Sequence, residues 1–570
     1  MVFVLLNWLV ILITTFGIGY AGWKGAQRFL GAEERVQSVL SVLFAGLALA
    51  CAYAQYVSIV HRVSILAFSI FAGAALLSIV RWHKEMRDLL QTSFHRLGRP
   101  AIVAVIALTL LVCFFTSRGS FIHDTNLYHA QSVRWIEEYG VVKGLGNIQS
   151  RASYNSGFFC LTALYAMKYA FGQSMHTVQG LMALLLAIAC LPLGELFHRE
   201  HRSLRIADFA RLGAVYYLSL TYREIMSPSS DFAVMIMLFY IVIRFLDLAE
   251  SGVKEASPYA LLCVLGAFVC TLKLTVGLIL LIVILPVIYL LRDRKGRYIW
   301  RYLLTGTLLV VPYLIRNVII SGWLLYPSTA LDLFDVDWKV PKLLADADAY
   351  QIRIWGKGIH IYGPEEAKIW TWMPNWFQTV LTSTEKLLVI AAMLAVIVVI
   401  VRLVRYALMD KEARSAQSQT GAVLLLETAL MASFLFWLFS APLTRYGYAY
   451  ILLFPMVTFG ELLVRHAGEK KATYLLALSG CLVIFGWKGA VLAQGVASSY
   501  LLPYYIVQTD YDNNEAETRS YEINGITFYE GVSGYHKLPG GGICFTMRGD
   551  RIEDGFIFEE KNETNIEWNE

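Results

Sequence analysis

A polar stretch follows the fourth long apolar segment of the chain and contains His123, Asp124, Tyr128 and His129. A carboxylate at the edge of a membrane is partly desolvated, and this raises its basicity, so Asp124 is a candidate general base. The two histidines are candidates to orient a substrate or to tune that carboxylate. Tyr128 starts one face of a predicted interfacial helix and is a candidate substrate contact. An aspartate here is also typical of a helix N-cap, so both interpretations of Asp124 stay open.

Three cations lie where apolar segments are expected to end on the same side as this stretch: Lys273, Arg316 and Arg445. Asn317 follows Arg316 directly. Lys273 interrupts an apolar run of about 35 residues that must fold back, since one span needs only about 20. Each cation alone is commonly a residue that extends to the membrane interface. Together with Asn317 they predict a binding site for an anionic lipid phosphate, which arginine grips with two hydrogen bonds.

A second polar segment, Ser227–Asp231, is preceded by Arg223 and is expected on the same side. Its Ser-Pro-Ser-Ser-Asp sequence is typical of the start of a helix, and capping is the role that we favour for it. The alternative is that Arg223 and Asp231 line the same outer cavity as Asp124 and contribute to substrate binding.

The cysteines and histidines show no spacing that is typical of a metal site. The eight cysteines include no Cys-x-x-Cys pair, and no Cys/His pattern resembles a zinc site. The sequence therefore indicates neither a metal-binding motif nor a disulfide framework. We assign no cofactor, and a requirement for a divalent metal ion stays open.

The composition indicates a membrane protein. Of the 570 residues, 57% are hydrophobic and only 16% are charged, whereas soluble domains carry about 25% charged residues. Long uncharged runs form helices in lipid, because the backbone must satisfy its own hydrogen bonds there. The alternation that is typical of a membrane barrel is absent. We predict an all-α multi-pass membrane protein with about fourteen spans, at 1–23, 38–60, 64–81, 101–116, 177–197, 207–222, 231–248, 258–272, 274–291, 300–316, 387–408, 421–440, 447–464 and 473–493.

Basic residues concentrate in alternate connections between these segments, and the cytoplasmic side retains such residues. Asp124 and both termini are therefore expected on the non-cytoplasmic side, with large outer loops at 117–156 and 317–386. The alternation holds only if the short apolar stretch 157–171 is an interfacial helix and not a span. The net charge of +5 arises largely from these connections and does not suggest a nucleic-acid partner.

The C-terminal tail begins near Ser498 and is polar. Its alternating runs Tyr521-Glu522-Ile523 and Ile526-Thr527-Phe528 flank Asn524-Gly525, which is a strong signal for a hairpin turn. We predict a small extracytoplasmic β-containing module at 498–570. The remaining divisions are N-terminal transmembrane helices at 1–100 and a catalytic membrane region at 101–497.

The order of features from about residue 100 to 490 resembles the GT-C membrane glycosyltransferases, which include the protein mannosyltransferases and the lipid A aminoarabinose transferases. The shared features are a span, an outer loop with an aspartate at its start, an interfacial helix, glycines and a second short helix. The resemblance implies a GT-C-like fold with Asp124 as catalytic base, although His123-Asp124 replaces the usual acidic pair. It also implies a polyprenyl-phosphate sugar donor whose phosphate is held by Arg316 and Arg445.

This resemblance implies sugar transfer to a glycan, lipid or protein at the outer face of the bacterial inner membrane. The chain is also similar to bacterial membrane proteins that share Arg-Asn…Ser-Gly…Tyr-Pro, here Arg316 to Pro327. The same proteins share a late Arg-Gly…Asp-Gly-Phe segment, here Arg548 to Phe556.

Three other functions are compatible with the sequence. A transporter or lipid flippase would use charges within the spans, and Glu195, Glu427 and Lys488 are such charges. An O-antigen polymerase or ligase would place its working residues in the larger outer loop, whose tryptophans could stack on sugars or simply anchor the loop. A surface-assembly scaffold would use the tail. The tryptophans in question are Trp355, Trp370, Trp372 and Trp376.

Overall fold

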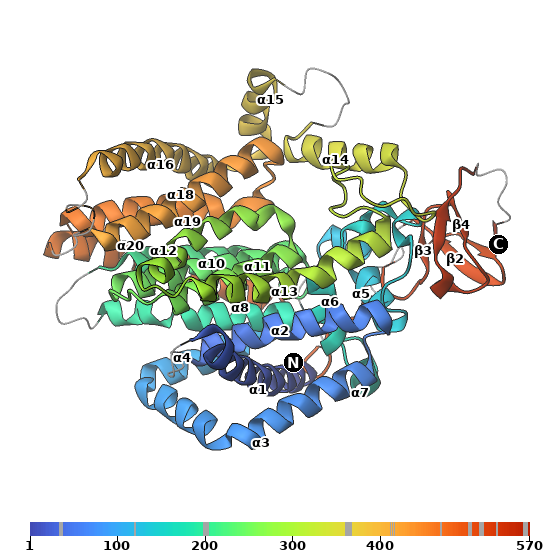
Figure 1. Cartoon of the computed structure of the whole chain (residues 1–570), viewed down its shortest axis with the longest axis horizontal. Coiled ribbons are helices and arrows are strands. Elements are labelled where there is room, and N and C mark those ends of the chain that lie inside the picture. Colours follow the sequence, from blue (N-terminus) through green and yellow to red (C-terminus); the bar gives the residue numbers. More distant parts are fainter. Residues whose placement is uncertain are drawn as a thin grey trace.

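The computed structural model describes the whole chain except residues 33–37, 119–120, 198–203, 360–367, 411, 413, 415–416, 468–469, 500–503, 512–517, 532–533, 562–567 and 570. Parts of several predicted basic connections thus lie outside the described residues. Twelve described helices are long and apolar enough to cross a membrane, which indicates a multi-pass membrane protein and confirms the helical fold class. Most run along the long axis of the molecule, with the strands at one end (Figure 1).

The twelve candidate spans are α1 Val2–Leu30, α2 Val39–Val60, α3 Ile65–Arg96, α4 Arg99–Arg118, α8 Val178–Ala189 with η4 Leu191–Phe197, α10 Ser230–Glu250, η5 Leu274–Val283 with α12 Ile284–Arg292, α13 Arg297–Ser321, α16 Ser383–Leu408, α18 Ser418–Ser440, α19 Thr444–Ala467 and α20 Lys471–Ser499.

Two of the fourteen predicted spans form helices that are shorter than the other twelve. These are α9, Ile206–Thr221, with 16 residues, and α11, Ala256–Leu272, with 17 residues. Directly after α11, Lys273 adopts an extended conformation with φ −157° and ψ 120°. The long apolar run therefore folds back at Lys273, as predicted.

The stretch predicted as an interfacial helix, 157–171, contains two short helices, α6 Gly157–Tyr165 and α7 Lys168–Phe171. Neither is long enough to span a membrane. Every residue of α6 is buried, so this helix lies inside the protein and not along its surface. The two loops predicted to lie outside hold further helical elements: η1 Thr125–His129, α5 Ala130–Glu138, η2 Leu145–Asn147, η3 Ser150–Ser153, α14 Lys342–Gly356, α15 Ile369–Asn375 and η7 Trp376–Val380. The C-terminal tail holds η9 Ile552–Asp554.

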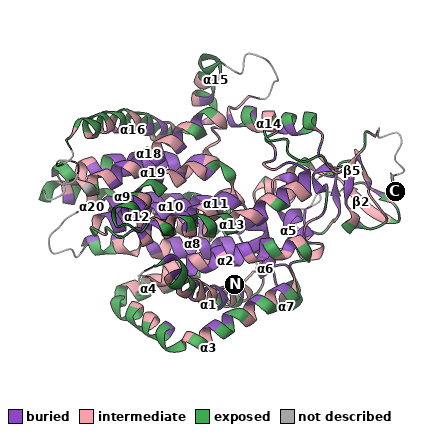
Figure 2. Ribbon diagram, viewed as in Figure 1, coloured by how far each residue is buried: buried purple, intermediate pink, exposed green. Residues whose placement is uncertain are grey.

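The centre of the bundle is formed by α10. Its run Phe232–Ile243 is apolar on every side and wholly buried, as expected of a helix that other helices surround. Much of the surface of α3, α16 and α20 is exposed instead (Figure 2). These outer helices are apolar as well, so their exposed faces suit contact with lipid.

Two of the charges within the spans, Glu427 and Lys488, are paired or packed against an aromatic ring, whereas Glu195 is exposed. Both oxygens of Glu427 accept hydrogen bonds from Arg402 Nη1, at 2.6 and 2.5 Å. Arg402 Nη2 also lies 2.8 Å from Glu461. Lys488 Nζ lies 4.4 Å from the centre of the Tyr216 ring. The ion pair with Arg402 explains how Glu427 can be buried within a span, for which the sequence offers no explanation.

Six short strands form the C-terminal module: β1 Ser520–Ile523, β2 Ile526–Glu530, β3 Gly540–Gly541, β4 Phe545–Met547, β5 Phe556–Phe558 and β6 Trp568–Asn569. The predicted hairpin is confirmed. Asn524 and Gly525 have φ values of 52° and 76°, and β1 pairs antiparallel with β2 around them. Both positive φ values match the tight turn that Asn-Gly favours.

The module shares a hydrophobic core with the first outer loop. Trp135 from α5 and Leu145 from η2 are buried together with Tyr521, Phe528 and Phe556 of the module. The rings of Trp135 and Phe556 are 6.1 Å apart between centroids. The tail is therefore packed against the loop that contains Asp124.

The two outer loops are also joined to each other by a buried carboxylate. Asp348 in α14 accepts hydrogen bonds from Tyr154 Oη at 2.6 Å and Tyr326 Oη at 3.0 Å. Burial raises the pKa of Asp348. This contact links Tyr154 of the first loop to the beginning and the middle of the second.

Candidate functional site

Four charged side chains from distant parts of the chain meet at one end of the bundle. Asp124 directly precedes η1, Asp231 lies in the first turn of α10, Lys273 follows α11, and Arg445 lies in the first turn of α19. We call these residues the four-charge cluster. The sequence predicted each of them as a candidate site residue.

Ion pairs join the members of the four-charge cluster. Arg445 Nη2 lies 2.5 Å from Asp124 Oδ2, and Arg445 Nε lies 3.7 Å from Asp231 Oδ2. Lys273 Nζ donates to the other carboxylate oxygen of Asp231. The four-charge cluster thus contains two carboxylates and two cations, and each carboxylate is paired with at least one cation.

Neither aspartate is used as a helix cap. The Asp124 side chain makes no capping hydrogen bond, and its backbone is already helical, with φ −61° and ψ −20°. Ser229, at the start of α10, makes no side-chain cap either, whereas Ser227 Oγ accepts a hydrogen bond from the Ile122 backbone at 3.0 Å. The capping interpretation is therefore wrong for Asp124 and for Ser229.

Arg445 is the most accessible member of the cluster. Its side chain is 40% exposed, against 17% for Asp124 and 16% for Asp231. Among the described residues, only its Nη2 has hydrogen-bond partners, and Nε is buried without one. The exposed part of the guanidinium thus keeps hydrogen-bonding capacity for an oxyanion.

The connection between α18 and α19 positions Arg445. Trp376 Nε1 donates to the Pro442 carbonyl, and Trp437 Nε1 donates to the Leu443 carbonyl, both at 2.9 Å. These bonds fix the backbone two and three residues before Arg445. Trp376 therefore anchors a loop, as one interpretation of the loop tryptophans expected. Trp372 is buried too, whereas Trp355 and Trp370 are exposed.

Aromatic side chains surround the cluster. Lys273 Nζ lies 3.5 Å from the centre of the Tyr446 ring, and Arg445 Nη2 donates to Tyr446 Oη at 3.2 Å. Tyr128, a predicted site residue, contacts the His129 ring at 4.4 Å between centroids. Sequence reasoning missed Tyr446, and its position next to Arg445 was the only available signal.

His129 is buried beside the cluster and is held as a neutral ring. Burial is the largest cause and lowers the pKa of His129 to about 4. The two carboxylates of the four-charge cluster oppose this shift, and its two cations add to it. Burial also raises the pKa of Tyr128 well above its ordinary value. Both side chains are therefore neutral hydrogen-bonding groups near physiological pH.

Arg316 and Asn317 are not part of the cluster, contrary to the expectation that they bind the donor phosphate. Arg316 is buried, and donates from Nε to Asn155 Oδ1 at 3.0 Å and from Nη1 to Ser58 Oγ. Asn317 donates to the Leu324 carbonyl at 2.9 Å. Both side chains are occupied in joining α13 to α2 and to the loops, because a buried guanidinium must satisfy its donors internally.

His123 and Arg223 lie at the surface. His123 directly precedes Asp124 and is exposed. Arg223 is also exposed, and its Nε donates to Tyr222 Oη at 2.9 Å. Glu224, which the sequence did not single out, is close enough for the Arg445 charge to lower its pKa, although burial raises that pKa overall.

No group of three or more His, Cys, Asp or Glu side chains that could hold a metal ion occurs among the described residues. No curated protein and no solved structure matches the chain significantly. One family model does match it, over residues 1–452, and this range includes all four members of the cluster. The chain therefore belongs to the family described as Domain of unknown function (DUF8201).

Proposed function

We propose that this protein is a membrane glycosyltransferase that moves a sugar from a polyprenyl-phosphate carrier to a hydroxyl of a glycan, lipid or protein. The observation that carries the proposal is the ion pair between Asp124 and the exposed guanidinium of Arg445. It places a candidate base beside a candidate phosphate-binding group. The resemblance of the outer-loop sequence to GT-C enzymes supports the same reaction.

The donor phosphate would bind to the exposed part of the Arg445 guanidinium, with Lys273 adding a second positive charge. A phosphate in this place competes with Asp124 for the guanidinium. The competition would loosen the carboxylate from its ion pair only when the donor is present. Base activation would then be coupled to donor binding.

In the transfer step, Asp124 removes the proton of the acceptor hydroxyl. The acceptor oxygen forms a bond to the anomeric carbon, and the bond from that carbon to the phosphate oxygen breaks with its electron pair. Negative charge grows on the departing lipid phosphate, and Arg445 stabilises it more in the transition state than in the ground state. Base assistance of this kind contributes on the order of 10²–10⁴-fold to the rate.

The basic connections support a site on the outer face. In the described residues, α19 has Arg445 of the four-charge cluster in its first turn and the basic residues Arg465 and His466 in its last turn. The cytoplasmic side retains basic residues. The N-terminal ammonium donates to the Tyr504 carbonyl at 3.0 Å, so the chain start lies beside the start of the tail. We place the cluster and both termini on the extracytoplasmic side of the plasma membrane.

The test compares Asp124→Asn with Asp335→Asn, an exposed carboxylate in the second outer loop. Lipid-linked and surface glycans are profiled in cells that carry each variant, the wild-type protein or no protein. We expect Asp124→Asn to give the same profile as cells without the protein, while Asp335→Asn matches the wild type. Binding of a polyprenyl phosphate to purified Asp124→Asn protein should persist, because its Arg445 remains.

Full glycan transfer by Asp124→Asn would remove the catalytic role of this carboxylate. An unchanged glycan profile in cells without the protein, together with altered uptake of a small solute, would favour the transporter. Loss of activity only after changes to Trp355 and Trp370, with Asp124→Asn active, would favour a polymerase or ligase that works from the larger loop.

A further inference from the structure

A cavity of about 400 Å³ lies between α1, α2, α10, α11 and α13. It is at the opposite end of the bundle from the four-charge cluster. Asp231 begins α10, whereas Leu248 at the other end of the same helix lines the cavity. Seventeen residues of helix separate these two positions, which is about 25 Å. The cavity is therefore a separate site, beside the basic connections.

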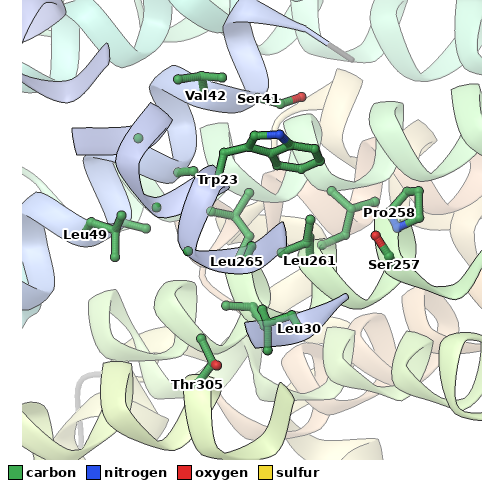
Figure 3. A pocket seen from close by; sticks show the side chains of 18 of the residues that line it. Trp23, Leu30, Ser41, Val42, Leu49, Ser257, Pro258, Leu261, Leu265 and Thr305 are labelled. Atoms are coloured by element: carbon green, nitrogen blue, oxygen red, sulfur yellow. The ribbon is translucent and has the colours of Figure 1, made fainter. Parts of the chain in front are cut away.

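The cavity is lined mainly by apolar side chains and by glycines. Trp23 from α1 and Leu261 and Leu265 from α11 project into the same space (Figure 3). Gly22 and Gly25 of α1 also line it, and a Cβ atom added at Gly25 would meet open space. The volume lies within the range of about 300–1,000 Å³ that is typical of ligand pockets.

Polar groups are confined to a few places in this cavity. Among the described residues, Trp23 Nε1 is buried without a hydrogen-bond partner, and leaving a buried donor unpaired costs about 1–3 kcal/mol. Arg244 lines the cavity and lies 3.6 Å from Asp247. At the rim, Arg301 donates to the carbonyl of Phe29 at 2.9 Å. A ligand that fits has a hydrocarbon chain, a hydrogen-bond acceptor and negative charge.

We propose that this cavity binds one acyl chain of an anionic glycerophospholipid from the surrounding membrane. The ester carbonyl accepts a hydrogen bond from Trp23 Nε1, and the phosphate lies near Arg244 and Arg301. The ester distinguishes this ligand from a polyprenyl phosphate, which has no carbonyl to offer. The site is independent of the proposed sugar transfer, because it lies at the other end of α10 and α11.

The experiment uses the full-length protein in phosphatidylcholine nanodiscs with a phosphatidylglycerol that carries a diazirine in one acyl chain. After irradiation, labelled peptides are identified by mass spectrometry. We expect labels in α1 and in α11 of the wild-type protein. Gly25→Leu adds a side chain whose Cβ atom meets no other atom within 4 Å. Labelling of these peptides should fall about tenfold, equivalent to a loss of about 1.4 kcal/mol.

Gly73→Leu is the matched control, since Gly73 lies in α3 and a Cβ atom there also meets open space. This variant should label like the wild type. Trp23→Phe should lower labelling by a diester probe and leave labelling by a diether probe unchanged. Thermal unfolding confirms that each variant is folded.

Equal labelling of Gly25→Leu and Gly73→Leu overturns the proposal. So does competition by an unlabelled polyprenyl phosphate where unlabelled phosphatidylglycerol fails to compete. Loss of labelling in Gly25→Leu with unchanged sugar transfer supports the lipid site and its independence from the proposed transfer site. Failure of the proposed sugar transfer would be seen in Asp124→Asn and not in the labelling of the cavity.

Discussion

Nη2 of Arg445 lies 2.5 Å from Oδ2 of Asp124, although 321 positions separate the two residues in the chain. The contact connects the start of the first outer loop to the start of α19. Arg445 lies 3.7 Å from Asp231 as well, so one guanidinium contacts two carboxylates. An incoming anion must therefore compete for a cation that is already paired, and this competition makes the site sensitive to the geometry of Arg445.

Replacing Arg445 with lysine is expected to lower sugar transfer by a factor of about 10²–10³, comparable to the loss of one preorganised donor to a developing charge. Lysine keeps the positive charge but lacks the planar fork that holds a phosphate with two hydrogen bonds. Arg445→Gln should lower transfer further. The initial rate with a radiolabelled lipid-linked sugar measures both effects. Arg223→Gln, an exposed change on the same side, should retain the wild-type rate.

Removing Lys273 is expected to destabilise the protein more than removing both members of its ion pair. In Lys273→Met, Asp231 keeps only the longer contact to Arg445, and breaking a buried pair from one side costs about 3–5 kcal/mol. Since 22% of the Lys273 side chain is exposed, we expect the lower end of that range. Lys273→Met with Asp231→Asn should recover much of the loss. Thermal unfolding midpoints in detergent give the comparison, and a double variant less stable than Lys273→Met would contradict it.

The hydrophobic pattern of the sequence was sufficient to predict the twelve described helices that are long and apolar enough to cross a membrane. The hairpin at Asn524-Gly525 was equally predictable, since the turn needs two residues that tolerate positive φ. The two predicted spans that fall short, α9 and α11, are apolar because neighbouring helices bury them. Periodicity does not distinguish an apolar face against protein from one against lipid.

The sequence predicted those site residues that are charged and lie at the ends of apolar segments. It did not predict which of these charges are used up by hydrogen bonds to neighbouring groups. Asp124, Asp231, Lys273 and Arg445 all lie at segment ends, and the structure brings them together. Arg316 lies at a similar end but points into hydrogen bonds with neutral groups. The sequence alone does not show which loop packs against an arginine and accepts its hydrogen bonds.

Stability is expected to fall when the pH drops from about 6.5 to about 4. His129 is buried with a pKa near 4, and an unfolded histidine has a pKa of about 6.5. The unfolded chain therefore binds more protons than the folded chain between about pH 4 and about pH 6.5. The neutral His129 ring contributes its full stabilisation above about pH 6.5, and the free energy of unfolding falls by about 1.4 kcal/mol for each pH unit below that. Thermal unfolding midpoints at pH 5 and 7 measure this effect. His129→Gln should flatten the dependence, whereas His123→Gln, which leaves His129 intact, should retain it.

Phe556→Ala is expected to loosen the C-terminal module from the first outer loop. Phe556 is fully buried and contacts Trp135, Phe528 and Phe545, and such a truncation costs about 3–5 kcal/mol. The twelve membrane helices do not depend on this contact, so the loss should be local. Hydrogen exchange should rise in β1, β2 and α5 while the exchange of α10 stays slow. Ile557→Ala, which alters the neighbouring residue on the opposite face of β5, should change the exchange little. Equal effects of the two changes would show that the module is held by something other than this shared core.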